Sequence, residues 1–272
     1  MLYFWIRRDD LLSQPAAGNG GRTVGVLSPV VPRKRLVVLG TLLALSAFAA
    51  ASSWRWSQSR PDHADEARHR VGAELDAGLK AVGSALGSPV FIRVFKEPPI
   101  LELWARSARD FVLFKKYPIC RFSGTLGPKT SEGDMQAPEG LYSIRSPQLN
   151  PRSRFYLSLN LGYPNPLETA RGWTGDSLMI HGNCVSTGCY AMGDQAISEI
   201  YTAVSEALRN GQDAVSVQAL PFPLEPANLA RHGQSPFHSH WESLAEAYSA
   251  FERTRLPPRV DVTGRGYSIT SP

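Results

Sequence analysis

The chain is predicted to adopt an α+β fold, mainly β, in which an antiparallel sheet is flanked by helices. Two observations support this prediction. Short apolar runs with period-two alternation and tight turns recur between residues 89 and 221, which is typical of antiparallel strands. Helical periodicity appears on either side, at residues 62–86 and 237–253. With 272 residues, 43% of them hydrophobic, the chain can form one well-packed domain with extensions.

The first expected element is an export segment. Arg33-Lys34-Arg35 precedes an uncharged run, residues 36–54, that is rich in Leu, Val and Ala. A basic flank followed by an apolar core is the secretory pattern. The run is longer than a typical signal-peptide core (up to ~15 residues) and just short of a membrane span (~20 residues), so cleavage and anchoring both stay open.

The export segment sets the expected compartment. Residues 1–35 are expected to be a cytoplasmic or disordered lead-in, and residues 36–55 a signal peptide or membrane anchor. The remainder is then exported, either into the periplasm or anchored in the inner membrane and facing the periplasm. Membrane contact would run through residues 36–54 if the segment is not cleaved.

A helix is predicted after Pro61, over residues 62–86, where Val71, Leu75 and Leu79 share an apolar stripe. Its other face is charged. We expect residues 56–88 to form a helical spacer that separates the following domain from the export segment or packs on that domain.

From residue 89 the pattern becomes that of strands. Val90, Ile92 and Val94 alternate with their neighbours, and further strands are expected at residues 100–104, 111–117, 141–144, 155–161, 178–180 and 215–219. The loop at residues 123–138 is too polar for the core. Loops of this length in a compact domain are commonly functional.

Two more helices are expected in the second half. One runs over residues 194–209, with Asp194 as its N-cap and Asn210-Gly211 closing it. The other, residues 237–253, presents one face made of Trp241, Leu244, Tyr248 and Phe251. The tail after Pro257-Pro258 is expected to be loose, so residues 222–272 are assigned to a helical C-terminal extension and tail.

The net charge is +5 and the isoelectric point is near 9.2. Such a balance suits an anionic polymer, a membrane surface or a carboxylate-rich cell wall. The lysines and arginines are scattered, however, and no zinc-finger or RNA-recognition spacing is present. Nucleic acid is therefore not an expected partner.

The strongest chemical signal lies in residues 178–192. An apolar run predicts a strand that ends at His181, and Cys189 follows after a turn. Thiol nucleophiles act as thiolates, and a nearby imidazole is the usual means of producing one near neutral pH. Gly188 lets a substrate carbonyl approach the backbone, where N–H groups from Gly188 to Tyr190 could hold an oxyanion. On spacing alone, a buried structural cysteine near an unrelated histidine is equally open.

This stretch resembles the signature of the YkuD-type L,D-transpeptidases, most closely that of the YafK-like subgroup. The family carries a strand-borne His-Gly pair and a downstream Ser-x-Gly-Cys-x-x-Met, which here read His181-Gly182 and Ser186-Thr187-Gly188-Cys189-Tyr190-Ala191-Met192. A second matching block lies upstream, at Cys120-Arg121-Phe122-Ser123-Gly124, Leu126-Gly127-Pro128-Lys129, Glu132-Gly133-Asp134 and Ala137-Pro138-Glu139-Gly140-Leu141-Tyr142. The resemblance covers roughly residues 89–221.

The resemblance implies an L,D-transpeptidase-like antiparallel β-sandwich or barrel as the catalytic domain, residues 89–221. It implies Cys189 as the nucleophile, His181 as the general acid and base, and backbone support from Gly188 and Tyr190. The implied substrate is the diaminopimelate-containing stem peptide of peptidoglycan, which forms a thioester with the cysteine and passes to an amine. No cofactor is expected.

Two departures from the family pattern leave the acyl acceptor open. Thr187 stands where many members have a second histidine, and Ala191 where they often have an arginine. The alternatives are a hydrolytic amidase that releases peptide or wall-linked lipoprotein from peptidoglycan, and an inactive wall-binding domain.

Other residues are candidates for orienting the base or binding substrate. Gly182, Asn183, Ser186 and Thr187 lie between base and nucleophile, although turn chemistry alone would explain the polar ones. The cations that could hold the stem-peptide carboxylates are Arg121, Lys129 and Arg145, each of which could equally be a surface charge.

The three cysteines allow several arrangements. A bridge between Cys120 and Cys184 would leave Cys189 free, a Cys184–Cys189 bridge would block the proposed chemistry, and three reduced thiols are the third option. His181, Cys184 and Cys189 would also suit zinc. Since no fourth ligand is evident, no metal site is predicted.

Overall fold

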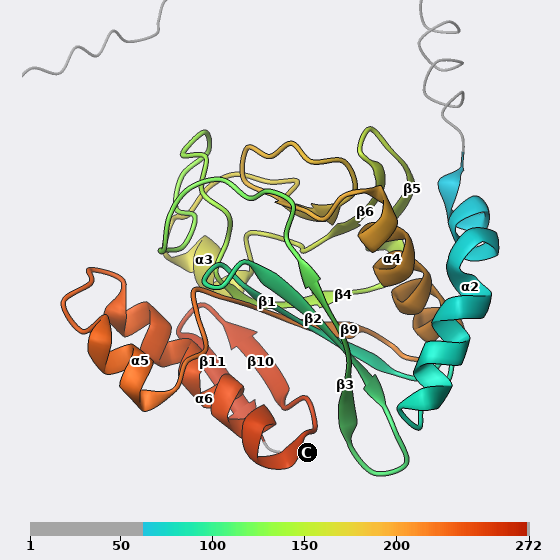
Figure 1. Ribbon diagram of the computed structural model, residues 1–272. Coiled ribbons are helices and arrows are strands. Elements are labelled where there is room, and N and C mark those ends of the chain that lie inside the picture. Colours follow the sequence, from blue (N-terminus) through green and yellow to red (C-terminus); the bar gives the residue numbers. More distant parts are fainter. Residues whose placement is uncertain (1–61, 271–272) are drawn as a thin grey trace, which may run out of the picture. The chain divides into compact units, whose positions relative to one another are not determined.

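A computed structural model describes residues 62–270, so the predicted lead-in and export segment lie outside the described residues. Within residues 62–270, no helix combines the length and the hydropathy that a membrane span requires. The described elements are two main sheets, several helices and a C-terminal hairpin (Figure 1).

The larger sheet has five strands in the order β3-β2-β1-β9-β4. Their bounds are β1 (Val90–Phe95), β2 (Ile100–Arg106), β3 (Phe111–Pro118), β4 (Gly140–Ile144) and β9 (Val215–Leu220). The central strand β1 is buried along its whole length. Val90, Ile92 and Val94 face the main hydrophobic core, whereas Phe91 and Phe95 join apolar clusters formed with the C-terminal helix.

The smaller sheet has four short strands in the order β5-β6-β7-β8. They are β5 (Leu149–Ser153), β6 (Tyr156–Asn160), β7 (Met179–His181) and β8 (Tyr190–Ala191). The predicted strand at residues 178–180 is therefore present, shifted by one residue. The strands β5 and β8 were not predicted, because two to five residues with a proline or a turn beside them carry little periodicity.

The N-terminal helix α2 (His63–Ala81) packs against α4 (Asp194–Arg209). Val71, Leu75 and Leu79 on α2 are buried. The predicted spacer helix is thus packed on the domain, which is one of the two arrangements expected for it. The expected N-cap at Asp194 is wrong by one residue, since Gly193 occupies that position and Asp194 begins the helix.

The chain after residue 221 packs on the larger sheet. It forms α5 (Pro226–Arg231), α6 (His238–Thr254), β10 (Arg259–Thr263) and β11 (Gly266–Thr270). Two short helices, η1 (Ser146–Gln148) and α3 (Pro166–Ala170), lie earlier in the chain. The expectation of a loose tail is wrong, because β10 and β11 pair as an antiparallel hairpin. Val260, Tyr267 and Ile269 pack on the cluster around Trp241, an alternation that the sequence already contained.

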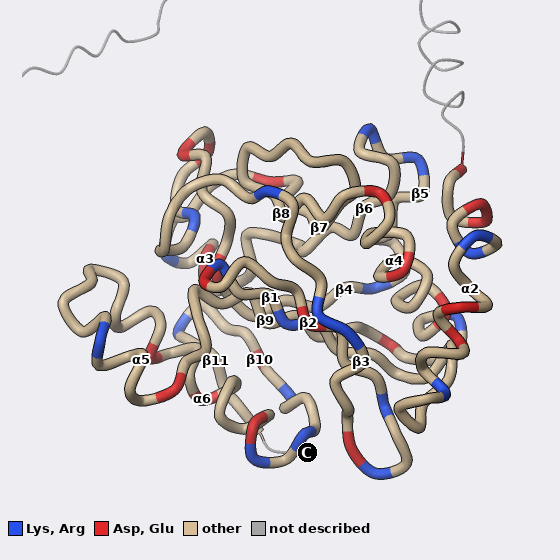
Figure 2. Tube along the Cα trace, viewed as in Figure 1, with Lys and Arg blue, Asp and Glu red and all other residues tan. Residues whose placement is uncertain are grey.

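A buried ion pair joins the larger sheet to α6. Lys96 and Glu139 meet at 2.9 Å with both side chains fully buried, and the indole N–H of Trp241 donates to Glu139 at 2.8 Å. Elsewhere in the described elements, basic and acidic residues are interspersed along the chain (Figure 2).

The predicted antiparallel sandwich or barrel needs two corrections. None of the sheets in residues 62–270 closes into a barrel. The sheets are also mixed, because β1 pairs with β9 and β7 with β8 in parallel. Parallel neighbours require a crossover connection. Between β1 and β9 this connection runs through most of the domain, whereas β7 and β8 are joined only by residues 182–189, and the strand pattern alone reveals neither pairing.

Candidate active site

The parallel pair β7–β8 brings the predicted base and nucleophile together. Ile180 pairs with Tyr190 and His181 with Ala191, so Cys189 lies next to the start of β7. With strands ~4.8 Å apart and a rise of ~3.3 Å per residue, the Cα atoms of His181 and Cys189 are about 8 Å apart. Strand alternation directs both side chains to the same face of this pair, opposite the fully buried Ile180 and Tyr190.

Cys189 is the unpaired cysteine of the three, all of which fall within the described residues. Its side chain is partly exposed, and its Sγ contacts the carbonyl of Ser177 at 3.7 Å. Burial raises the pKa of the Cys189 thiol, while the backbone N–H of Met179 and the positive charge of Lys129 oppose that rise. The thiol is therefore protonated at rest near neutral pH.

His181 is buried, with 1% of its surface exposed, and its ring stacks on Phe155 at 4.4 Å between ring centres. The Nδ1 atom lies 2.5 Å from the carbonyl oxygen of Gly182, which can only accept, so Nδ1 carries the proton and Nε2 is the basic nitrogen. Burial lowers the pKa of His181, and the bond to Gly182 partly offsets this. A neutral imidazole with a free Nε2 is the form that a general base requires.

The thiol of Cys189 and the imidazole of His181 share no hydrogen bond in the described structure. The thiol instead contacts the carbonyl of Ser177, and the imidazole contacts the carbonyl of Gly182. Both groups are neutral at rest. The arrangement therefore differs from a preformed thiolate–imidazolium pair and fits proton transfer that accompanies attack. Such contacts commonly shorten only when substrate is bound.

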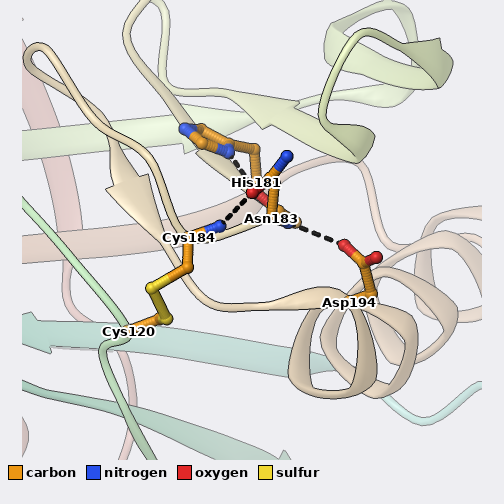
Figure 3. The surroundings of a disulfide bond; sticks show 6 residues. Cys120, His181, Asn183, Cys184 and Asp194 are labelled. Atoms are coloured by element: carbon orange, nitrogen blue, oxygen red, sulfur yellow. Dashed lines mark hydrogen bonds between the residues drawn. A yellow bond between two sulfur atoms is a disulfide. The ribbon is translucent and has the colours of Figure 1, made fainter.

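The turn between base and nucleophile is tied to the segment that follows β3. Cys120 and Cys184 form a disulfide (Figure 3). The backbones of Arg121 and Ala191 exchange hydrogen bonds of 3.1 and 2.8 Å. The turn is thus held near its start and just after its end. The bridge also removes Cys184 from the zinc-type ligand set that the sequence offered.

The backbone around the thiol is partly occupied. The N–H of Gly188 donates to the hydroxyl of Ser186 at 3.2 Å, and that hydroxyl donates to the carbonyl of Cys189 at 2.7 Å. Tyr190 belongs to the pairing with β7, and its phenol donates to the carbonyl of Pro138. Among the expected donors in residues 188–190, the N–H of Cys189 itself has no acceptor within the described residues and is the one available to an oxyanion.

Gly188 occupies a conformation and a space that suit only glycine. Its φ is +137°, and a Cβ there would lie 3.2 Å from the Leu178 side chain and 3.4 Å from the carbonyl of Gln136. The polar loop at residues 123–138 therefore closes directly against the residue that precedes the nucleophile. The sequence predicted a loop of a commonly functional kind at residues 123–138 but did not indicate which residues it contacts.

The three candidate cations fall in different places. Arg121 is exposed, and its backbone pairs with Ala191, two residues after the nucleophile. Lys129 is buried and pairs with Asp134 at 2.6 Å, so it organises the loop and acts on Cys189 through its charge. Burial alone would raise the pKa of Asp134, but bonds from Lys129 and three backbone N–H groups hold it at about 2.

Arg145 lies apart from the thiol. It lines a cavity of about 1050 Å³ between β4, β9 and the C-terminal hairpin, and its guanidinium contacts the carbonyl of Asp213 at 3.4 Å. No residue from 120–138 or 177–192 lines this cavity. The structure therefore brings Arg121 and Lys129 to the site but not Arg145.

The remaining candidates serve the turn. Asn183 has a φ of +58°, and its side chain accepts a bond from the N–H of Cys184 at 2.6 Å. Thr187 is exposed. Gly182 is buried, and a Cβ there would lie 2.6 Å from the carbonyl of Phe155. Turn chemistry thus accounts for Asn183 and Ser186.

Sequence reasoning missed three contributors to the site. Phe155 supports the imidazole, Met179 directs its N–H at the sulfur, and Asp194 accepts the N–H of Asn183 at 2.7 Å. Asp194 could have been found, because an acidic residue at a helix start just beyond a nucleophile turn can reach back to that turn. The other two depend on strand register and have no local signal.

Comparison with known proteins identifies relatives along most of the chain. Two Escherichia coli proteins, from strain K12 and strain O157:H7, both named "Putative L,D-transpeptidase YafK", are 46% identical to it over 187 residues. The match spans 69% of this chain and 76% of each relative. No family model matches the chain.

Solved structures give more distant matches. The helical cell shape determining protein Pgp2 of Campylobacter jejuni aligns in its K307A mutant form with a TM-score of 0.41 and 19% identity, covering 65% of this chain but only 61% of that one. A second structure of Pgp2 gives 0.39 and 17%, covering 69% and 79%. Bd1075 of Bdellovibrio bacteriovorus gives 0.35 and 14%, covering 64% and 77%. Overlaps of this size carry no argument about the site.

Proposed function

The chain belongs to the YafK-like L,D-transpeptidase family, and from this premise we propose that it is a cysteine-dependent acyltransferase of the bacterial cell wall. The observation that carries the proposal is the pairing of β7 with β8. It sets an unpaired thiol and a neutral imidazole on one face, with the imidazole already oriented by a backbone carbonyl.

The first half-reaction forms a thioester. As Cys189 Sγ attacks the amide carbonyl of the substrate, His181 Nε2 takes the thiol proton, and a C–S bond forms. The N–H of Cys189 donates to the oxyanion that develops. The C–N bond then breaks, and His181 returns the proton to the leaving amine.

The second half-reaction regenerates the thiol. An incoming amine attacks the thioester carbonyl, a C–N bond forms and the C–S bond breaks. His181 takes the proton of the attacking amine and returns it to the sulfur. The thiol and the imidazole are thus both regenerated, and neither half-reaction requires a cofactor.

The proposed substrate is a peptidoglycan stem peptide in which the attacked carbonyl adjoins diaminopimelate. The support is family membership together with two cations, one on the segment paired with Ala191 and one whose charge acts on the thiol. Exposed Arg121 is free to hold a stem-peptide carboxylate, and Lys129 adds positive charge behind the sulfur. We also propose export to the periplasm, with cleavage or anchoring at residues 36–55.

Hydrolysis is the second candidate, and one observation favours it. At position 191, where family members often present an arginine, this chain has an alanine that is fully buried between His181 and Arg121. The position cannot present a cation to an incoming acceptor. With the second histidine also replaced, by exposed Thr187, water can take the place of the amine and release peptide or lipoprotein from the wall.

The test is to incubate the purified protein with diaminopimelate-containing muropeptides and with lipoprotein-linked peptidoglycan, and to determine the product masses. Cross-linked or amino-acid-exchanged products support transfer, whereas freed peptide or lipoprotein supports hydrolysis. The matched control is Cys189→Ala. Products that form equally well with this variant would contradict a cysteine-dependent mechanism of either kind, and no products with either protein would favour an inactive wall-binding domain.

A further inference from the structure

We propose that Asp194 is a positioning residue for His181, acting through the peptide group that joins Gly182 to Asn183. The carbonyl of this group accepts the Nδ1 bond of His181 at 2.5 Å, and its N–H donates to Asp194 Oδ1 at 2.7 Å (Figure 3). One planar unit therefore connects the imidazole to a carboxylate. The inference rests on the proposed function, in which His181 is the base.

The connection transmits orientation. Because the peptide group is planar, holding its N–H against Asp194 also fixes the direction of its carbonyl. The carbonyl fixes the tautomer and tilt of the imidazole, which leaves Nε2 to receive a proton. A ring held in this way needs no adjustment when the proton moves, and small misplacements of a catalytic group are costly.

The connection also transmits charge. A carboxylate at the N–H end polarises the peptide and makes its carbonyl oxygen a stronger acceptor. The stronger acceptor stabilises the imidazolium that forms when His181 takes the thiol proton. Asp194 thus acts like the acid of a triad with one peptide group inserted between acid and base.

The surroundings are shaped to let the carboxylate approach. A Cβ on Gly182 would lie 2.7 Å from Asp194 Oδ1, so a side chain there would displace it. The N–H of Gly193 donates to the carbonyl of Asn183 at 2.8 Å, which closes the turn onto the start of α4. Since Gly193 is the N-cap and makes no side-chain cap bond, the helix start is held by this contact with the turn.

Within residues 62–270, no acidic side chain other than Asp194 is connected to the His181 ring, either directly or through a peptide group, by hydrogen bonds. The elements packed on His181 contribute the Phe155 ring, Ser158 across β6 and Ala191 across β8, none of which titrates. The titratable or charged groups around the turn are Cys189, Asp194 from α4, Arg121 on the segment paired with Ala191, and Lys129, whose charge acts on Cys189.

The test compares Asp194→Asn and Asp194→Ala with Glu206→Gln, which removes the same charge at the other end of α4. The imidazole of His181 is titrated by NMR, and Cys189 is alkylated with iodoacetamide from about pH 5 to about pH 9. Asp194→Asn keeps an acceptor but removes the charge, so the pKa of His181 falls by roughly 0.5 to 1 unit. Asp194→Ala also frees the turn, and alkylation near neutral pH slows about 100-fold.

The inference is overturned if both Asp194 variants give the His181 titration and alkylation profile of Glu206→Gln. It is equally overturned if they lower only the unfolding temperature, which is what a purely structural contact predicts. Neither readout needs a muropeptide, so both judge the role of Asp194 even if the wild-type protein turns over no wall substrate.

Discussion

The two sheets of this protein are held together in different ways. The central strand of the larger sheet is buried along its whole length, and buried ion pairs lie within the sheet, Arg93 with Glu102, and at the ends of its strands, Lys96 with Glu139. The smaller sheet ends in strands of three and two residues, and its reactive turn is fixed by a disulfide, backbone exchanges and side-chain caps. Apolar packing therefore supplies stability in one sheet, while specific polar contacts supply geometry in the other. Damage to each should have a different consequence.

Among substitutions in the smaller sheet, His181→Gln should have the largest effect on turnover. Loss of the general base lowers turnover on the order of 10³-fold, because positioned acid–base catalysis typically contributes 10²–10⁴-fold. The measurement is kcat on the preferred muropeptide. The control is His240→Gln, which alters a buried histidine of α6 bonded to the Glu139 carbonyl. If both variants lose turnover equally, the assignment of the base is wrong.

The larger sheet should respond most to Glu139→Ala. The substitution leaves Lys96 buried without a partner, and burial already lowers the pKa of Lys96 against the opposing effect of Glu139. Unfolding in denaturant should show a loss of about 3–5 kcal/mol. Glu206→Gln weakens a partly exposed pairing with Arg68 and Arg209 and should cost less than about 1 kcal/mol. A loss at Glu139 no larger than at Glu206 would contradict the role given to the pair.

Removing the disulfide tests whether loss of stability and loss of turnover can be separated. Cys120→Ala with Cys184→Ala opens a bridge that spans 64 positions, and chain entropy puts the loss of stability at roughly 4 kcal/mol. Because the bridge also holds the reactive turn, turnover should fall in the protein that remains folded. Denaturant unfolding and kcat are measured on the same preparation. Full turnover in the variant would show that the other contacts hold the turn without the bridge.

The smallest effect depends on pH and concerns Glu168 near β4. Burial raises the pKa of Glu168 to about 7, against bonds from Tyr142 and Asn165 that lower it. The folded state keeps this proton up to about pH 7, whereas the unfolded chain releases it near 4.5. Stability should therefore fall as pH rises between these values, by roughly 3 kcal/mol in total.

The pH prediction is checked by urea unfolding of the wild type and Glu168→Gln across this range. The variant cannot ionise, so this component of the pH dependence should be absent from its profile. Identical slopes in the two proteins would place the titrating group elsewhere.

The sequence predicted the larger sheet better than the smaller one. Long apolar alternations fixed β1, β2, β3 and β9 to within a residue or two, because packing on a core imposes that period. It did not reveal the parallel pairings or the C-terminal hairpin. The pairing of β1 with β9 joins residues far apart in the chain, and the pairing of β7 with β8 involves strands of only three and two residues. The weak alternation around Val260 and Ile269 follows two prolines that suggested a loose tail.

The candidate site was predictable in its chemistry and less so in its geometry. Cys189 and His181 followed from the residue types and the family resemblance. Their neutral resting state depends on burial, which spacing does not report. The occupation of the Gly188 N–H by Ser186 and the reach of Asp194 depend on how the turn closes. The placement of Arg145 at a separate cavity shows that a cation within the matching region need not lie near the thiol.

The most direct test of the account is the mass of the protein itself during turnover. Rapid mixing with a diaminopimelate-containing stem peptide, followed by acid quenching and peptide mapping, should place an acyl group on Cys189 in the wild type and none in Cys189→Ala. An adduct on another residue, or product formed by the alanine variant at the wild-type rate, would contradict the claim that this thiol carries the reaction.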